Sequence, residues 1–166
     1  TIVFEKYYKG GAEDLRPQRS ATKSVTSALV GIAIGQGLIE CTDSQAYRFL
    51  PRSIQEDMND AARTITVRHL LTMTSGLYHN PPAVLIEPAA LGVLFSTGMV
   101  YAPGTVFAYN GNNTSLLSVM ITHTSGLRAS EFARQYLFDR IGVKQAKWAE
   151  GAEYTVGDVD LQLTTR

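Results

Sequence analysis

The sequence contains a single cysteine, Cys41, so no disulfide can form within the chain. Its 15 basic and 15 acidic residues balance, and no basic run occurs, which argues against a broad nucleic-acid-binding surface. No segment reaches the roughly 18 continuous apolar residues of a membrane span. The chain starts without methionine or a leader-like segment, and it stops without a closing element. We therefore expect a domain cut at both ends, and the compartment stays open.

Signature motifs of several enzyme classes are also missing. No Gly-x-Ser-x-Gly elbow occurs, which disfavours a conventional α/β-hydrolase, and no Gly-x-x-x-x-Gly-Lys loop supports nucleotide binding. No two histidines have the spacing of metal ligands, and one cysteine cannot build a zinc site. We therefore expect neither a metal nor an organic cofactor. Among the histidines, His69 is interpreted as structural, His79 as part of a loop and His123 as lying near a helix end.

The spacing of apolar residues predicts a mostly helical chain. The 166 residues, 45% of them hydrophobic, suffice for one domain over residues 1–166 with a real core. The strongest helical pattern begins at Ser20 and ends at Gly35 to Gly37. Further helices are predicted over residues 43–50, 66–73, 88–95, 114–124 and 130–141, with Thr66 and Ser130 as N-caps and Gly76, Gly126 and Gly142 as stops.

Strand signals are confined to the two ends of the chain. Residues 2–8 mix aromatic and β-branched side chains and are followed by Gly10-Gly11, which predicts a strand and a turn. The tail from Lys144 onward is predicted to be loop with a short strand. Pro103-Gly104 marks a further turn.

The segment Ser20-Ala21-Thr22-Lys23 is a candidate catalytic motif. A serine hydroxyl is a poor nucleophile until a neighbour takes its proton. Residues three apart on a helix share a face, so the Lys23 amine can reach the Ser20 oxygen. The helix N-terminus adds free amides and the positive end of the dipole, which favour developing negative charge. By spacing alone, a helix cap beside a solvated lysine is the simpler interpretation, so the assignment depends on context.

Three ordered segments supply that context. Residues 20–29, 64–77 and 103–109 resemble, in order and spacing, segments of class C β-lactamase-like serine hydrolases. This group lies within the serine β-lactamase and penicillin-binding-protein superfamily and includes esterases, DD-peptidases and 6-aminohexanoate-oligomer hydrolases. The resemblance covers nearly the whole chain. It implies an α+β fold of the β-lactamase/transpeptidase type, here mostly the helical region with a partial antiparallel sheet.

The resemblance also implies a third catalytic residue, Tyr109. A tyrosine at this place in the family hydrogen-bonds the nucleophile and acts as general base, or as acid for the leaving group. A phenol titrates near ~10, so it needs a cationic neighbour, which Lys23 would supply in a coupled titration. The interpretation without catalysis is a core aromatic residue.

The second motif departs from the family pattern. Where the family commonly has tyrosine-x-asparagine, this chain has Tyr109-Asn110-Gly111. Asn112 and Asn113 are the candidates for the substrate contact through a shifted loop. The alternative is that both are turn residues that cap the following helix. The departure favours an esterase or amidase over a true β-lactamase.

The family's third motif, a Lys- or His-x-Gly strand, is not found after Tyr109. Lys9-Gly10-Gly11 has the letters but precedes Ser20 and is interpreted as a turn. The chain would then supply only the Ser20 amide of the oxyanion hole, and one missing donor costs about 3 kcal/mol in the transition state. We therefore expect the chain by itself to be poorly active or inactive.

The resemblance implies an acyl-enzyme on Ser20 and hydrolysis of a small ester, amide or β-lactam. The alternative is a non-catalytic or slowly acylating module that binds penicillin or peptidoglycan, which the absent third motif favours. An incomplete sheet leaves an exposed edge and an apolar face. We therefore expect a second copy or a companion chain to cover it.

Overall fold

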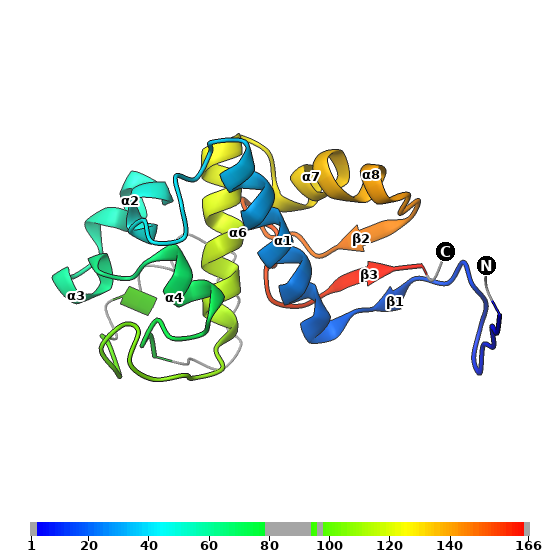
Figure 1. The fold of residues 1–166 in the computed structure, drawn as a ribbon, viewed down its shortest axis with the longest axis horizontal. Helices are drawn as coiled ribbons and strands as arrows, with labels where there is room; N and C mark the ends of the chain where they lie inside the picture. Colours follow the sequence, from blue (N-terminus) through cyan, green and yellow to red (C-terminus); the bar gives the residue numbers. More distant parts are fainter. Residues whose placement is uncertain (1–2, 79–93, 96–97, 165–166) are drawn as a thin grey trace.

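The computed structural model describes residues 3–78, 94–95 and 98–164 (Figure 1). The α-helices are α1 (Thr22–Gly35), α2 (Arg52–Glu56), α3 (Asp60–Arg63), α4 (Val67–Leu71), α6 (Gly111–Ser125), α7 (Ala129–Ala133) and α8 (Asp139–Ile141). Two 3₁₀ turns (Arg19–Ala21 and Ala46–Phe49) and a π turn (Arg134–Phe138) join them. The strands are β1 (Arg16–Pro17), β2 (Ala146–Trp148) and β3 (Leu161–Leu163). The predicted α+β class is confirmed.

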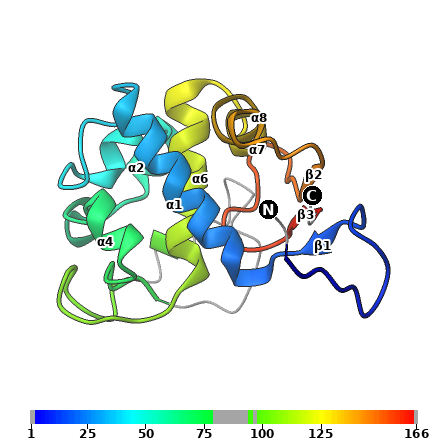
Figure 2. The ribbon, with the colours of Figure 1, turned by 45° about the vertical axis from the view of Figure 1, so that its right-hand side comes forward.

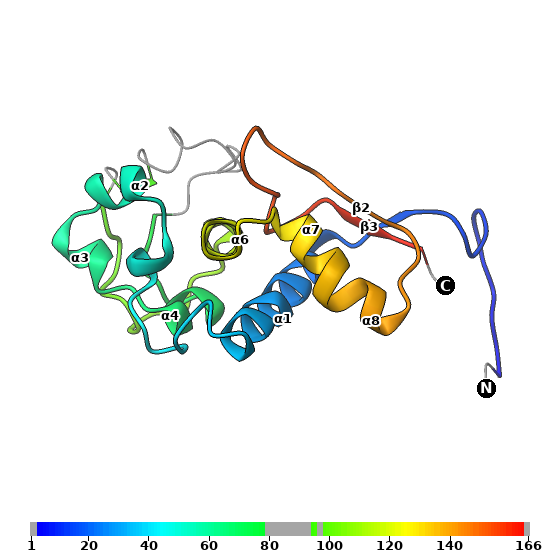
Figure 3. The same ribbon diagram turned by 90° about the horizontal axis from the view of Figure 1, so that it is seen from above.

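A small antiparallel sheet brings the two ends of the described chain together. Its order is β1-β3-β2, with Arg16 opposite Leu163 and Trp148 opposite Leu161. The strand predicted over residues 2–8 is wrong for residues 3–8, which form no strand and extend away from the body in Figures 1 and 3. β-Strands form where a pairing partner exists, and here the partner strand β3 pairs with residues 16–17 instead.

Helix α1 follows the predicted pattern from its first turn to its end. Leu29, Val30 and Ala33 are buried in the core, whereas Ala28 on the same helix is exposed. At its end, the Gln36 amide donates to the Ile32 carbonyl at 3.0 Å. Gly37 then takes φ 73°, a left-handed conformation that glycine adopts freely.

Helix α6 forms the centre of the helical body. It begins at Gly111, three residues earlier than predicted, because the side chain of Asn110 caps it by accepting from the Asn112 amide at 3.0 Å. Every residue from Asn112 to Ile121 is buried, the pattern of a helix enclosed on all sides. Gly126 ends it at φ 74°, as predicted.

The amino-terminal ends of α1 and α6 lie at the same end of the helix pair (Figures 1 and 2). The two helices pack side by side, and α4 also contacts α6. Functional groups on the first turns of α1 and α6 therefore face the same region of the molecule.

The short helices agree with the predictions in part. Thr66 caps α4 as predicted, accepting from the His69 amide at 3.2 Å. The helix predicted over 43–50 is only the 3₁₀ turn over 46–49. Residue 129, not 131, begins α7, so Ser130 is not its cap; the carboxylate of Glu131 instead accepts from the Arg128 amide at 2.8 Å. The helix predicted over 88–95 and the loop with His79 lie outside the described residues, except for the buried Leu94 and Phe95.

Helices α7 and α8, with the π turn between them, pack against β2 (Figure 3). Phe138 from the π turn and Trp148 from β2 are both buried in the shared core. Over the part of the chain that the structure describes, no helix is both long and apolar enough to cross a membrane.

Candidate active site

Ser20 lies on the 3₁₀ turn that leads into α1, two residues before the helix begins. It is exposed to solvent. The preceding residue, Arg19, has φ 50°, a left-handed conformation that costs a non-glycine residue about 1–2 kcal/mol. Such a turn presents the Ser20 hydroxyl outward, at the positive end of the α1 dipole.

Tyr109 meets Ser20 from a segment far away in the sequence. Its phenol donates a hydrogen bond to Ser20 Oγ at 2.9 Å across 89 positions of the chain. The segment is fixed on one side by Asn110, the cap of α6, and on the other by Ala108, whose amide donates to the Met73 carbonyl at 2.9 Å. Tyr109 itself is 54% exposed, so the pair lies on an open surface.

Lys23 lies beside this pair, one turn along α1. Its Nζ is 5.2 Å from the centroid of the Tyr109 ring. Among the described residues its ammonium makes no hydrogen bond with Ser20; it donates to the carbonyl oxygen of Asp158 at 2.7 Å and lies 3.9 Å from the Asp158 carboxylate. The predicted trio of Ser20, Lys23 and Tyr109 is therefore brought together, with the phenol hydrogen-bonded to the serine and its ring beside the lysine.

The pKa of Tyr109 is lowered from its ordinary value. The hydrogen bond with Ser20 is the largest cause; burial opposes it, and the Lys23 ammonium lowers the pKa further. The charge of Asp158 acts in the opposite direction. A lowered pKa makes the phenolate, the form that can accept a proton from Ser20, more accessible.

Asp158 lies beside Lys23 at the candidate site, and sequence reasoning did not identify it. The segment that carries it, residues 155–158, lies between α1 and α6, where side chains of both helices bind its carbonyls. Thr26 donates to the Gly157 carbonyl at 2.7 Å, and Ser118 donates to the Thr155 carbonyl at 2.7 Å. No local pattern marks this loop, because its position depends on contacts with two helices distant in the sequence.

Glycine is required at position 157 for this segment to fit. A Cβ there would lie 2.2 Å from the carbonyl oxygen of Thr114 in α6, far inside van der Waals contact. The close approach of the segment to α6 brings the Asp158 side chain to Lys23.

Asn112 and Asn113 are both buried in the first turn of α6. Asn113 accepts a hydrogen bond from Ser75 Oγ at 2.6 Å, and Asn112 donates to the Tyr78 carbonyl at 3.4 Å. Their observed contacts hold residues 73–78 against α6. The predicted substrate contact of these two asparagines stays a prediction.

A cavity of about 310 Å³ opens next to Lys23, between α1, α4 and α6. It is lined by Lys23, Ser24, Ser27, Leu71, Met73, Thr114 and Leu117. The mixture of hydroxyl and aliphatic groups suits a small acyl chain with some polarity.

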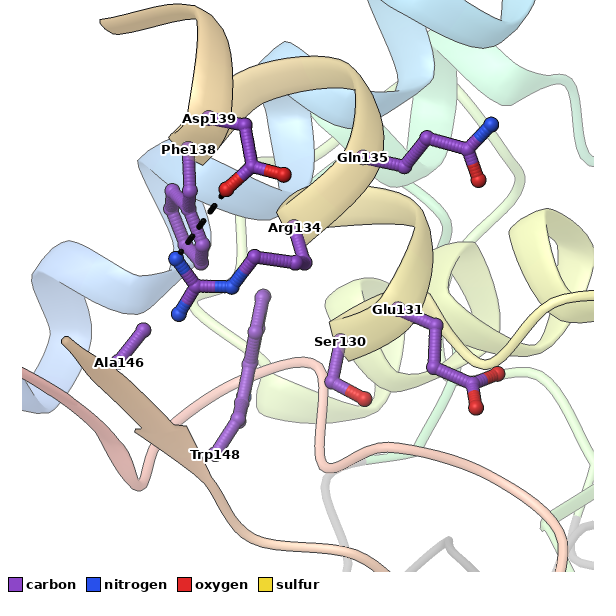
Figure 4. A pocket seen from close by; sticks show the side chains of 8 residues that line it. All are labelled: Ser130, Glu131, Arg134, Gln135, Phe138, Asp139, Ala146 and Trp148. Atoms are coloured by element: carbon purple, nitrogen blue, oxygen red, sulfur yellow. Dashed lines mark hydrogen bonds and ion pairs between the residues drawn. The ribbon is translucent and has the colours of Figure 1, made fainter. Parts of the chain in front are cut away.

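A second cavity has a volume of about 390 Å³ (Figure 4). Residues of α7, the π turn and β2 line it, and a salt bridge of 3.4 Å joins Arg134 and Asp139 at its side. Neither Ser20 nor Tyr109 contributes to it, so it has no part in the candidate active site.

Comparison with known proteins identifies the family of this site and fold. The model of the beta-lactamase family matches residues 5–158. The chain therefore belongs to the beta-lactamase family, and the resemblance predicted from its motifs is confirmed.

Solved structures share the fold at low sequence identity. A beta-lactamase/D-alanine carboxypeptidase from Pseudomonas syringae is 18% identical with a TM-score of 0.77, over 95% of this chain and 49% of that one. A protein of the same description from Yersinia pestis is 18% identical (TM-score 0.74; 91% and 50% covered). An octameric penicillin-binding protein homologue from Pyrococcus abyssi is 16% identical (TM-score 0.76; 94% and 43% covered).

The chain spans about half the length of the solved structures that it matches. The predicted β-lactamase/transpeptidase-like fold is thus confirmed for the part that the chain contains. No curated protein matches the sequence at a significant level.

Proposed function

We propose that this chain carries the nucleophilic centre of a serine hydrolase that forms an acyl-enzyme on Ser20. The observation that supports this most is the hydrogen bond of 2.9 Å between Tyr109 and Ser20, with the Lys23 ammonium against the same phenol ring. Membership of the beta-lactamase family agrees with this chemistry.

The proton path follows from the order of the three groups. As a phenolate, Tyr109 accepts the proton of Ser20, and the serine oxygen then attacks the carbonyl carbon of the substrate. The lowered pKa of Tyr109 and the neighbouring Lys23 charge both favour the phenolate. When the tetrahedral intermediate collapses, Tyr109 returns the proton to the departing alcohol or amine.

Deacylation uses the same groups in reverse. A water molecule gives a proton to Tyr109 while its oxygen attacks the acyl ester, and Ser20 recovers the proton as the acid leaves. Developing negative charge on the carbonyl oxygen would be stabilised by the amides at the start of α1. The cavity beside Lys23 is the place where we expect the acyl group of the substrate.

An ester or amide is the proposed substrate class. The sequence has glycine at position 111, where a β-lactamase motif would have asparagine. The exposed position of Ser20 and Tyr109 leaves room for acyl groups of varied size.

Covalent labelling tests the proposal directly. The protein is treated with a fluorophosphonate and analysed by intact mass and peptide mapping, beside Ser20→Ala, Tyr109→Phe and the control variants Ser53→Ala and Tyr101→Phe. We expect one adduct, on Ser20, which Ser20→Ala abolishes and Tyr109→Phe slows by about 10²–10⁴-fold, the usual contribution of a general base. The controls should label at the unmodified rate.

Turnover separates the two functional classes. Release of many equivalents of alcohol from a chromogenic ester supports a hydrolase. One equivalent of adduct on Ser20 without further release would identify a module that only acylates. Labelling that survives Ser20→Ala, or no labelling of the unmodified protein, would refute the proposed nucleophile.

A further inference from the structure

The side chain of Asp158 occupies space that any other residue at position 111 would need. A Cβ built on Gly111 would lie 2.5 Å from Asp158 Oδ2, 3.2 Å from its Cγ and 3.4 Å from its Cβ. Gly111 is the first residue of α6, directly after the cap Asn110. Its missing side chain therefore leaves room for the carboxylate at the entrance of the helix.

Asp158 binds Lys23 through both its main chain and its side chain. Its carbonyl oxygen accepts from Lys23 Nζ at 2.7 Å, and its carboxylate lies 3.9 Å from the same nitrogen. The side chains are only 11% (Lys23) and 23% (Asp158) exposed, so water competes little for the pair. The Asp158 backbone cannot shift easily, since Thr26 holds the preceding carbonyl.

We propose that the Asp158 carboxylate is a positioning group that holds the Lys23 ammonium beside Tyr109, and that glycine at position 111 is what admits it. Position 111 is also the place where the tyrosine-x-asparagine pattern would put an amide. The carboxylate of Asp158 thus occupies the space where the pattern would have an asparagine side chain on α6. This inference rests on the proposed function of Ser20.

The charges around Tyr109 make it possible to distinguish a positioning role of Asp158 from a direct effect of its charge on the pKa of Tyr109. Asp158 faces Lys23 and Tyr109, and Asp160 is the other charged group that acts on it. Its negative charge by itself raises the pKa of Tyr109, whereas the Lys23 ammonium lowers it. Loss of Asp158 as a mere charge would shift the pH profile of Ser20 labelling to lower pH. Loss of Asp158 as a support for Lys23 would shift it to higher pH.

The first test is the pH dependence of fluorophosphonate labelling of Ser20. We expect Asp158→Ala to lower the rate about tenfold or more and to move the rising limb to higher pH, with partial recovery in Asp158→Asn, which keeps an acceptor. The matched control Asp160→Asn removes a neighbouring charge and should label like the unmodified protein. Thermal unfolding of each variant excludes loss of the fold. An unchanged rate, or a limb moved to lower pH, would overturn the inference.

A double-variant cycle tests the role of Gly111. The Cβ of Gly111→Ala must displace the carboxylate, so this variant should slow labelling as Asp158→Ala does. In the Asp158→Ala background, Gly111→Ala should add no further loss, because the carboxylate is already absent and the remaining Cβ of residue 158 lies 3.4 Å away. Additive losses would show that glycine at this position serves something else.

A measurement without catalysis separates this inference from the proposed function. The pKa of the Asp158 carboxyl is raised, mainly by burial, and the Lys23 charge opposes that rise. Carbon-13 NMR titration should therefore show a still higher pKa for Asp158 in Lys23→Met. An unchanged titration would disprove the pairing even if Ser20 labels normally. A protein that shows the coupling but no labelling of Ser20 would refute the hydrolase proposal and the positioning role together.

Discussion

Two buried threonines on α1 offer a sharp test of how residues 155–158 are held. Thr22 and Thr26 lie one turn apart, and both are fully buried. Thr26 Oγ1 donates to the Gly157 carbonyl at 2.7 Å, whereas Thr22 Oγ1 has no hydrogen-bond partner among the described residues. Valine has nearly the shape of threonine, so substitution at each position changes hydrogen bonding and little else.

The two variants should therefore change stability in opposite directions. Thr26→Val leaves the buried Gly157 carbonyl unpaired, which costs about 1–3 kcal/mol. For a domain of this size, about 2–4 °C per kcal/mol converts that cost into a fall in Tm of roughly 2–12 °C. Thr22→Val removes an unpaired buried hydroxyl, so the change should lie between zero and a gain of about 1 kcal/mol.

Urea unfolding followed by circular dichroism, together with thermal scans, measures both changes. The labelling rate of Ser20 is recorded in parallel, since Thr26→Val also loosens the loop that carries Asp158. A loss of stability in Thr22→Val equal to that in Thr26→Val would refute the reasoning. It would mean that burial of a hydroxyl group, and not the bond from Thr26 to residue 157, determines the effect.

Substitutions at four other positions test individual features of the fold. Gly157→Ala places a Cβ 2.2 Å from a carbonyl oxygen of α6 and should destabilise the protein by about 1–3 kcal/mol in urea, whereas Gly31→Ala, with open space around it, should gain about 0.5–1 kcal/mol. Arg19→Gly should be neutral or stabilising and Arg19→Val destabilising in thermal scans, because residue 19 has φ 50°, a conformation that β-branched residues adopt least readily. Burial, with the Arg68 charge, lowers the pKa of His69, whose Nδ1 accepts a backbone amide at the start of α4. The folded state therefore binds this proton less well than the unfolded state does. The free energy of unfolding should be at its full value above the ordinary histidine pKa near ~6.5 and should fall as the pH drops through the lowered pKa of His69. His69→Gln should flatten this pH dependence of stability, and an unchanged slope would contradict the reasoning.

The helix predictions that are confirmed rest mostly on signals local in the sequence. Thr66 caps α4 and Gly126 ends α6 as expected, because caps and left-handed stops depend on residues within one turn. The first turn of α1 likewise depends on local spacing, which is why Ser20 and Lys23 could be paired. Tyr109 was found only through the resemblance, since no local rule connects positions 89 residues apart.

Contacts between residues distant in the sequence account for the wrong strand prediction. The strand expected over residues 2–8 had a suitable composition, but β3 pairs with Arg16 and Pro17 instead. The predicted start of α7 was wrong because the carboxylate of Glu131 accepts from the Arg128 amide, so that the helix begins before Ser130.

The sequence by itself determined helix α1, the cap of α4, the end of α6 and the spacing that sets a hydroxyl and an amine on one turn, because these follow from interactions between neighbours. Only the tertiary structure decided that the phenol of Tyr109 meets Ser20, and that the carboxylate of Asp158 fills the space left by Gly111 beside Lys23. The physical reason is that Lys23 and Asp158 are 135 positions apart and meet only when residues 155–158 are bound between α1 and α6.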